Sequence, residues 1–171
     1  MQEENSCHNL LLTSLTSYYN KNPEYKIILN DIIEGKHKLS LRLIDWLVTH
    51  YSKVNKIYYW IHKKNNDIYL QYPSEKDEIY NRDMKKVNIY LDYRAQLKSY
   101  AKINFDSFRR HNRITFILDE GKKIETTIGQ LNFFRWTFNN KIIEYTLLNY
   151  NDIYNDMIDN NIKKKKSQKE K

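Results

Sequence analysis

The chain has 171 residues, of which 40% are hydrophobic and 29% are charged, so it can bury a core and is not globally disordered. Its single cysteine, Cys7, excludes an intrachain disulfide framework and a zinc site built on cysteines, and favours a reducing compartment. The formal net charge of +8 attracts polyanions, but six lysines against one glutamate over residues 163–171 supply +5 of it, so the body charge alone does not establish nucleic-acid binding.

Three short helices are predicted at the start of the chain. Apolar residues recur at helical spacing in three stretches, residues 9–19, 25–33 and 41–51. Asn22 and Pro23 suit the start of the second helix, because asparagine can cap and proline at the first helical position loses no needed donor. Gly35 falls where a left-handed cap would end that helix, and Ser40 can cap the third.

Two hairpins are predicted in the middle of the chain. Residues 56–62 and 68–72 are rich in aromatic and β-branched residues and flank a turn cluster. Residues 113–118 and 122–126 form the second pair around a turn in which Gly121 can supply a positive φ. Between the hairpins, a short strand is predicted to open near Val87, and helical spacing begins at Tyr93.

The most apolar helical pattern of the chain lies in residues 128–138, which Thr126 or Thr127 can cap. An asparagine pair breaks it, residues 141–148 follow as a strand or a second helix, and a last helix is predicted over 152–162. We therefore predict one α+β domain over residues 1–162, with N-terminal helices, a small, mostly antiparallel sheet of two hairpins, and C-terminal helices. Residues 163–171 are expected to be a disordered, lysine-rich tail.

The candidate functional segment is FDSFRRHNR, residues 105–113, which interleaves cations with aromatic residues. Arginine forks match phosphate oxygens, and aromatic rings can stack on unpaired bases. The competing interpretation is a solvated loop in which Phe105 and Phe108 enter the core and Arg109 or Arg110 pairs with Asp106 or Glu125. Arg94, Lys98 and Lys102 are expected on the helix just before this segment, roughly one turn apart, in a cationic row. The predicted nucleic-acid-binding residues are Arg94, Lys98, Lys102, Arg109, Arg110 and Arg113, with Lys163, Lys164, Lys165 and Lys166 adding non-specific attraction.

Two other interpretations of exposed segments remain open. The aromatic residues of the first hairpin predict a protein-interaction surface made of Tyr58, Tyr59, Trp60, Tyr69 and Tyr72. Residues 126–148 could form a helix-turn-helix that places its second helix in a major groove, although the exposed face would be short and acidic.

No catalytic pattern is present. The five histidines lack metal-ligand spacing, and three glycines leave no phosphate-binding loop. We predict a protein that is not an enzyme and has no cofactor and no metal site, although carboxylates distant in sequence could meet in the fold. The polar, acidic N-terminus does not resemble a signal peptide, and no apolar run approaches the ~20 residues that cross a bilayer. We therefore expect a soluble, intracellular protein without membrane insertion.

At YRAQLKSYAK, FDSFRRHNRITF and ETTIGQLNFFRWTFNNKIIEY the sequence resembles an uncharacterised family encoded by nucleocytoplasmic large DNA viruses of the giant-virus kind. The resemblance covers roughly residues 87–148, with 39–60 as a further stretch. It implies a viral protein made in host cytoplasm, and it carries no activity and no site residue.

We therefore predict a non-catalytic viral protein that binds nucleic acid non-specifically, in genome handling or virion assembly. The alternative is a structural or scaffold protein that contacts other viral proteins, and the weaker alternative is a transcription regulator. The expected location is the host cytoplasm, in the viral factory, or the virion. The sequence leaves open the oligomeric state and the choice between DNA and RNA.

Overall fold

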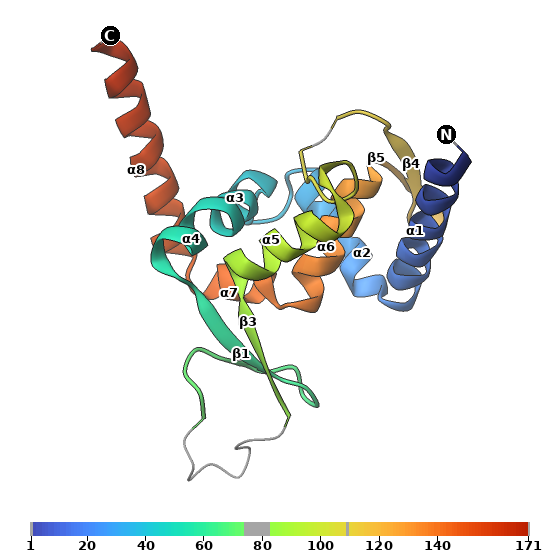
Figure 1. The fold of residues 1–171 in the computed structure, drawn as a ribbon, viewed down its shortest axis with the longest axis horizontal. Helices are drawn as coiled ribbons and strands as arrows, with labels where there is room; N and C mark the ends of the chain where they lie inside the picture. Colours follow the sequence, from blue (N-terminus) through green and yellow to red (C-terminus); the bar gives the residue numbers. More distant parts are fainter. Residues whose placement is uncertain (1, 74–82, 109, 171) are drawn as a thin grey trace. The chain divides into compact units, whose positions relative to one another are not determined.

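The computed structural model describes residues 2–73, 83–108 and 110–170, with side chains from residue 9 onward. Helices at both ends with antiparallel strands between them confirm the predicted α+β class (Figure 1). The helices are α1 (Gln2–Lys21), α2 (Pro23–Ile33), α3 (Leu41–Trp46), η1 (Leu47–Tyr51), α4 (Ser52–Asn55), α5 (Ile89–Tyr100), η2 (Lys102–Asn104), η3 (Asp119–Gly121), α6 (Ile128–Asn139), α7 (Ile142–Leu148) and α8 (Tyr150–Lys169). The strands are β1 (Tyr58–His62), β2 (Ile68–Tyr69), β3 (Met84–Asn88), β4 (Ile114–Ile117) and β5 (Lys123–Thr126).

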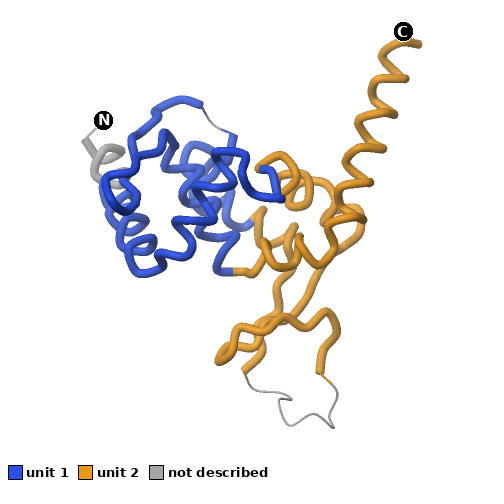
Figure 2. The backbone as a smooth tube through the Cα atoms, turned by 180° about the vertical axis from the view of Figure 1, so that it is seen from behind, with its two compact units in different colours: residues 1–40, 95–139 blue, residues 41–94, 140–171 orange. Residues whose placement is uncertain are grey.

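The chain divides into two compact units, where the sequence predicted one domain over residues 1–162. Unit 1 combines residues 1–40 with 95–139, and unit 2 combines residues 41–94 with 140–171 (Figure 2). Each unit is therefore assembled from segments that lie far apart in the sequence.

Unit 1 is built around α6, in which nine of the twelve residues are buried. Helix α1 packs on α6 and on α2, and contributes the fully buried Leu15 and Tyr19. The Tyr19 hydroxyl donates a hydrogen bond of 2.7 Å to the backbone oxygen of Leu131, so even this polar group is satisfied inside the core. The Tyr25 ring of α2 stacks on Phe138 with centroids 4.5 Å apart.

The β4–β5 hairpin of unit 1 follows the predicted pattern. Phe116 pairs with Ile124 across the strands, and both are buried, whereas the alternate residues Thr115 and Ile117 are exposed. The turn uses Gly121 at φ +77°, as the sequence indicated.

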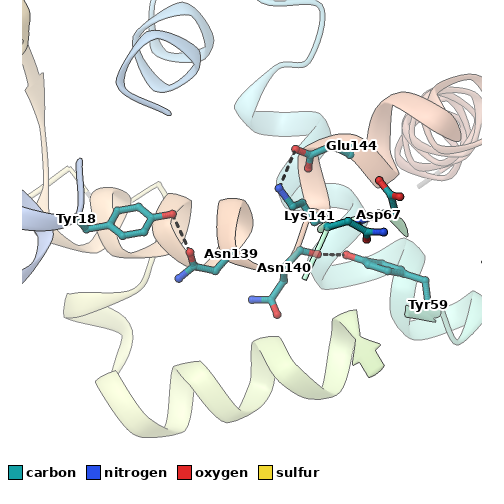
Figure 3. A network of polar contacts seen from close by, with 8 residues as sticks. Tyr18, Tyr59, Asp67, Asn139, Asn140, Lys141 and Glu144 are labelled. Carbon is teal, nitrogen blue, oxygen red and sulfur yellow. Dashed lines mark hydrogen bonds and ion pairs between the residues drawn. The ribbon is translucent and has the colours of Figure 1, made fainter. Parts of the chain in front are cut away.

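Unit 2 contains a three-stranded antiparallel sheet in the order β2-β1-β3. The strands of the two predicted hairpins thus belong to two sheets. Tyr59 pairs with Val87 in this sheet, and both are fully buried. The Tyr59 ring stacks on Tyr145 of α7 at 5.0 Å, and its hydroxyl donates to the backbone oxygen of Asn140 (Figure 3).

The change from strand β3 to helix α5 occurs at Asn88, earlier than the sequence predicted. The Asn88 side-chain oxygen accepts a hydrogen bond from the backbone N–H of Leu91 at 3.2 Å, and the Asp92 carboxylate accepts one from the backbone N–H of Asn88 at 3.1 Å. This reciprocal cap satisfies two donors that a helix start otherwise leaves open. The apolar alternation after Val87 was a misleading signal because the cap ends the strand there.

The C-terminal segment is helical throughout its described length. Lys141, at φ 56°, separates α6 from α7, and residues 142–148 form a helix, one of the two predicted alternatives. Helix α8 continues to Lys169, so the expected disordered tail is helical in the structure. Buried Ile153 and Met157 anchor its first turns, and lysine has a good helix propensity and suits the negative end of the helix dipole. None of the described helices is long and apolar enough to span a membrane.

Unit 2 should lose stability as the pH rises above about 10, where an unfolded tyrosine ionises. Burial, with smaller effects of Tyr51 and Asp152, raises the pKa of Tyr145 to about 12. Between these two pH values the unfolded state therefore releases a proton that the folded state keeps, so alkali favours unfolding. We expect Tyr145→Phe to flatten the fall in urea-unfolding free energy between about pH 10 and pH 12 relative to its own value at pH 7. An unchanged slope would contradict this assignment.

Candidate functional site

Helix α6 and the segment of residues 102–107 approach each other unusually closely in unit 1. A Cβ atom on Gly129 would lie 3.0 Å from the backbone oxygen of Ile103 and 3.1 Å from that of Asp106. Only glycine permits this separation, since the neighbouring atoms are backbone and cannot rotate away. Gly129 therefore sets the position of the segment that precedes the predicted cationic loop.

Side chains of α6 then fix this segment by hydrogen bonds. The Gln130 amide donates to the backbone oxygen of Ser107 at 3.2 Å, and the Asn132 amide donates to that of Asn104 at 2.8 Å. Thr127 caps α6, as predicted, by accepting the backbone N–H of Gln130 at 3.1 Å. Residues 104–107 are thus held through their backbone oxygens, and these hydrogen bonds do not depend on the side chains of the segment.

Phe105 anchors residues 102–107 in the core of unit 1. It is fully buried, and its ring centroid lies 5.7 Å from that of Phe133 and 5.8 Å from that of Trp136. Tyr100, the last residue of α5, stacks on its other side at 6.2 Å. The prediction that Phe105 enters the core is confirmed, whereas Phe108 is 47% exposed and does not enter it.

Four of the predicted cations, Lys98, Lys102, Arg110 and Arg113, make no ion pair among the described residues. Across the described side chains, in residues 9–73, 83–108 and 110–170, no salt bridge involves any of the four. All four side chains are exposed. Arg109 lies outside the described residues.

The competing interpretation paired Arg109 or Arg110 with Asp106 or Glu125. Among the described residues no salt bridge joins Arg110 to either acid, and Arg109 lies outside them. The Asp106 carboxylate accepts the backbone N–H of Phe108 at 2.9 Å, which forms a local turn. The Glu125 carboxylate accepts the hydroxyl of Thr115, its partner across the β4–β5 hairpin, at 2.7 Å. Each acid accepts a hydrogen bond from a near neighbour, and neither forms a salt bridge with Arg110.

The expected row of cations on one helix is interrupted. Arg94 and Lys98 lie one turn apart on α5 and are exposed. Helix α5 ends at Tyr100, and Ala101 has φ 64°, so Lys102 begins the separate turn η2. A helical periodicity extended past its end produced the wrong placement of Lys102.

In chemical terms, unit 1 presents exposed cations without ion-pair partners among the described residues, together with one half-exposed aromatic ring. Guanidinium groups without a carboxylate partner can donate to phosphate oxygens in pairs. The Phe108 ring offers a face on which an unpaired base can stack. This arrangement suits a polyanion.

The predicted aromatic surface of unit 2 is divided between the two faces of the sheet. Tyr59 points into the core, so its assignment to an interaction surface is wrong. Tyr58, on the opposite face because strand side chains alternate, is 48% exposed. The ring of Trp60 contacts those of Tyr58 and Tyr72 edge-on at 5.6 and 5.5 Å. Tyr69, half-buried, pairs with Trp60 across the strands.

Lys86 also lies on this outer face and was not among the residues predicted from the sequence. It pairs with Trp60 in the β1–β3 register, and its Nζ lies 4.8 Å from the ring centroid of Tyr58 and 5.8 Å from that of Trp60. These distances are within cation–π range. The contact of Lys86 with these rings could have been predicted only from the correct bounds of β3, which set its cross-strand partner.

The remaining predicted residues lie on α8 and α7. Lys163, Lys164, Lys165 and Lys166 are exposed on α8. The proposed recognition helix, α7, has only seven residues, and Leu147 and Leu148 are its exposed positions. Lys141 and Glu144 pair with each other at 4.0 Å, so the geometry offers no polar face for reading bases.

No group of three or more histidine, cysteine, aspartate or glutamate side chains in the described part of the chain is arranged to hold a metal ion. The carboxylates considered in the sequence therefore do not converge among these residues.

Comparison with known proteins identifies relatives but no activity. The sequence profile of a family of unknown function, DUF7197, matches residues 5–171. The "Uncharacterized protein L507" of Acanthamoeba polyphaga mimivirus is 33% identical over 152 residues, which cover 86% of this chain and 52% of that protein. The chain thus spans about half the length of this curated relative. No solved structure matches. The expected resemblance to an uncharacterised giant-virus family is confirmed.

Gly129→Ala tests whether the close approach to residues 102–107 is required. Glycine to alanine in a helix normally stabilises by about 0.5–1 kcal/mol. Here the added methyl meets backbone atoms at 3.0 and 3.1 Å, so we expect a loss of about 1–3 kcal/mol in the free energy of unfolding. Chemical denaturation measures the effect, with Ser99→Ala on the exposed side of α5 as the control. A gain in stability from Gly129→Ala would refute the packing argument.

Proposed function

The chain belongs to the DUF7197 family and is similar to a protein of a giant virus, and we propose that it is a non-catalytic viral protein that binds nucleic acid through the phosphate backbone. The observation that supports the proposal is that four exposed cations of unit 1, Lys98, Lys102, Arg110 and Arg113, have no ion-pair partner among the described residues. The proposed role is genome handling or virion assembly, in the host cytoplasm or in the virion.

The contrast with other lysines of unit 1 supports this assignment. Lys26 is buried and pairs with Asp119 at 3.1 Å, and Lys36 pairs with Glu34 at 2.7 Å. Lys122 approaches the same glutamate at 3.7 Å. These three lysines contact acids, whereas Lys98, Lys102, Arg110 and Arg113 contact none among the described residues.

The fixed backbone of residues 102–107, which includes Lys102, lowers the cost of ordering that part of the site on binding. Ordering a flexible loop on a ligand costs conformational entropy, whereas residues 102–107 are already held by Gly129, Gln130, Asn132 and the buried Phe105 ring. Arg94 and the lysines of α8 add attraction that does not depend on base sequence. Such binding should be non-specific and steeply dependent on salt.

Replacing Arg110 and Arg113 together by glutamine should weaken binding to a single-stranded oligonucleotide and reduce its salt dependence. Each lost phosphate contact lowers the slope of log K against log salt by about 0.7 for single strands, so the double variant should lose about 1.4. Fluorescence anisotropy of a labelled oligonucleotide over a salt series measures both quantities.

The matched control is Lys36→Gln with Lys122→Gln, which removes the same charge from two lysines that contact Glu34. Equal losses in the two double variants would attribute binding to net charge alone and overturn the proposed site. Substituting glutamine for residues 163–166 separately reports the contribution of α8. Binding that disappears with those four lysines, while Arg110 and Arg113 are intact, would also overturn it.

A scaffold role is the second candidate, favoured by the exposed aromatic face of unit 2. Tyr58 is 48% and Tyr72 43% exposed on the sheet face that carries Trp60, and tyrosine and tryptophan are frequent anchors of protein interfaces. In this role Trp60→Ala should abolish concentration-dependent association seen by sedimentation velocity, and Arg110→Gln with Arg113→Gln should leave it intact. Association that survives Trp60→Ala would exclude this face as the interface.

A further inference from the structure

Helix α8 of unit 2 is anchored only along its first half. Ile153 and Met157 are buried, and the Trp46 indole donates to the Asp156 carboxylate at 2.9 Å. Helix α8 contacts α3, η1 and α7. By contrast, every residue from 162 to 170 is exposed, and Figure 1 shows the second half of α8 extending away from these helices.

The free part of α8 is a poor isolated helix. Helices that lack tertiary contacts are marginal in water. Four consecutive lysines, residues 163–166, add repulsion between like charges. An anionic partner that also covers apolar surface would therefore stabilise this part of α8 beyond what its anchored first half supplies.

An apolar stripe runs along α8 beside its buried side. Tyr154, Ile158 and Ile162 recur every four residues, with Tyr154 41% and Ile162 46% exposed and Ile158 half-buried. The Tyr150 ring extends the stripe by stacking on Tyr154 with centroids 5.5 Å apart. Residues four apart lie on one helix face, so these side chains form a continuous ridge.

The charges beside this ridge change sign along the helix. Asp152 and Asp159 precede Lys163 and Lys166 in the sequence. Their separations of seven, four and three residues correspond to about two turns, one turn and one turn, so all four lie along one side of the ridge. No salt bridge within the described residues uses them.

We propose that two copies of the chain associate through antiparallel α8 helices, with the two-fold axis at Ile158. Ile158 then lies opposite itself, and Tyr154 of each copy lies opposite Ile162 of the other. A two-fold axis brings the same side of both ridges together. Asp152 of one copy therefore faces the level of Lys163 and Lys166 of the other.

This pairing would give the free part of α8 both opposite charge and cover for its apolar ridge. The acidic first half of one α8 neutralises the basic second half of its partner, twice per dimer. The apolar ridge is covered in the same contact. A parallel pair would instead place lysine against lysine, which costs energy. The inference rests on α8 of unit 2 and does not depend on the nucleic-acid site proposed for unit 1.

Charge exchange tests the proposal. Nuclease-treated full chain should show a concentration-dependent dimer by sedimentation equilibrium. Asp152→Lys and Lys163→Glu, each alone, should raise the dimer Kd about tenfold or more. Mixing the two variants should restore a heterodimer, because the Asp152→Lys position of one chain then faces the Lys163→Glu position of the other. Lys21→Glu, an exposed change in unit 1, is the charge control. A monomer at all concentrations, or no recovery on mixing, would overturn the proposal.

Cysteine crosslinking tests the orientation and the register. In a Cys7→Ser background, Ile158→Cys should form an intermolecular disulfide, because the axis places this residue opposite itself. Ile162→Cys should not, since its two copies would lie about 12 Å apart along the helices. Equal crosslinking of both variants indicates a parallel pair, and none of either excludes α8 as the interface. Either result overturns the proposal, and circular dichroism confirms that both variants are folded.

Discussion

Unit 1 depends on one constraint, the almost complete burial of α6. A helix buried on most sides must find internal partners for its polar side chains and for the groups packed against it, since water cannot reach them. The structure meets this requirement with Tyr19 on the backbone of Leu131, Asn132 on Asn104 and Thr137 on the backbone of Phe133. Each of these bonds either joins α6 to another segment or satisfies a group inside it.

The same constraint organises the candidate site. Residues 102–107 lie against α6 because Gly129 leaves room and Phe105 fills the aromatic core. Next to this held backbone, Asp106 accepts a local hydrogen bond, and the side chains of Arg110 and Arg113 are exposed. In unit 2, strand geometry instead separates the buried aromatic residues from the exposed ones. Strand alternation places Tyr59 inside and Tyr58 outside, so neighbouring tyrosines have opposite roles.

The elements with strong local signals were predictable from the sequence. The alternation over residues 113–118 and the turn at Gly121 identified the β4–β5 hairpin, and apolar spacing identified α6 together with its Thr127 cap. The giant-virus family was predictable from residues 87–148. Boundaries were less predictable where polar side chains decide them. The Asn88–Asp92 cap ended a strand whose apolar alternation continued, and the break at Ala101 ended a helix whose cations continued.

By itself, the sequence determined the α+β class, most of the helices and strands, and the excess of positive charge, because these follow from local periodicity and composition. Only the tertiary structure decided which residues of each segment are available. Phe105 and Phe108 are equivalent in a sequence pattern, yet one is fully buried and the other half-exposed. Among the described residues Arg110 has no acid partner, while Asp106 and Glu125 accept hydrogen bonds from the Phe108 backbone and the Thr115 hydroxyl. The conformation of the lysine-rich segment was likewise decided by Ile153 and Met157, whose burial anchors the helix that composition alone presented as a tail.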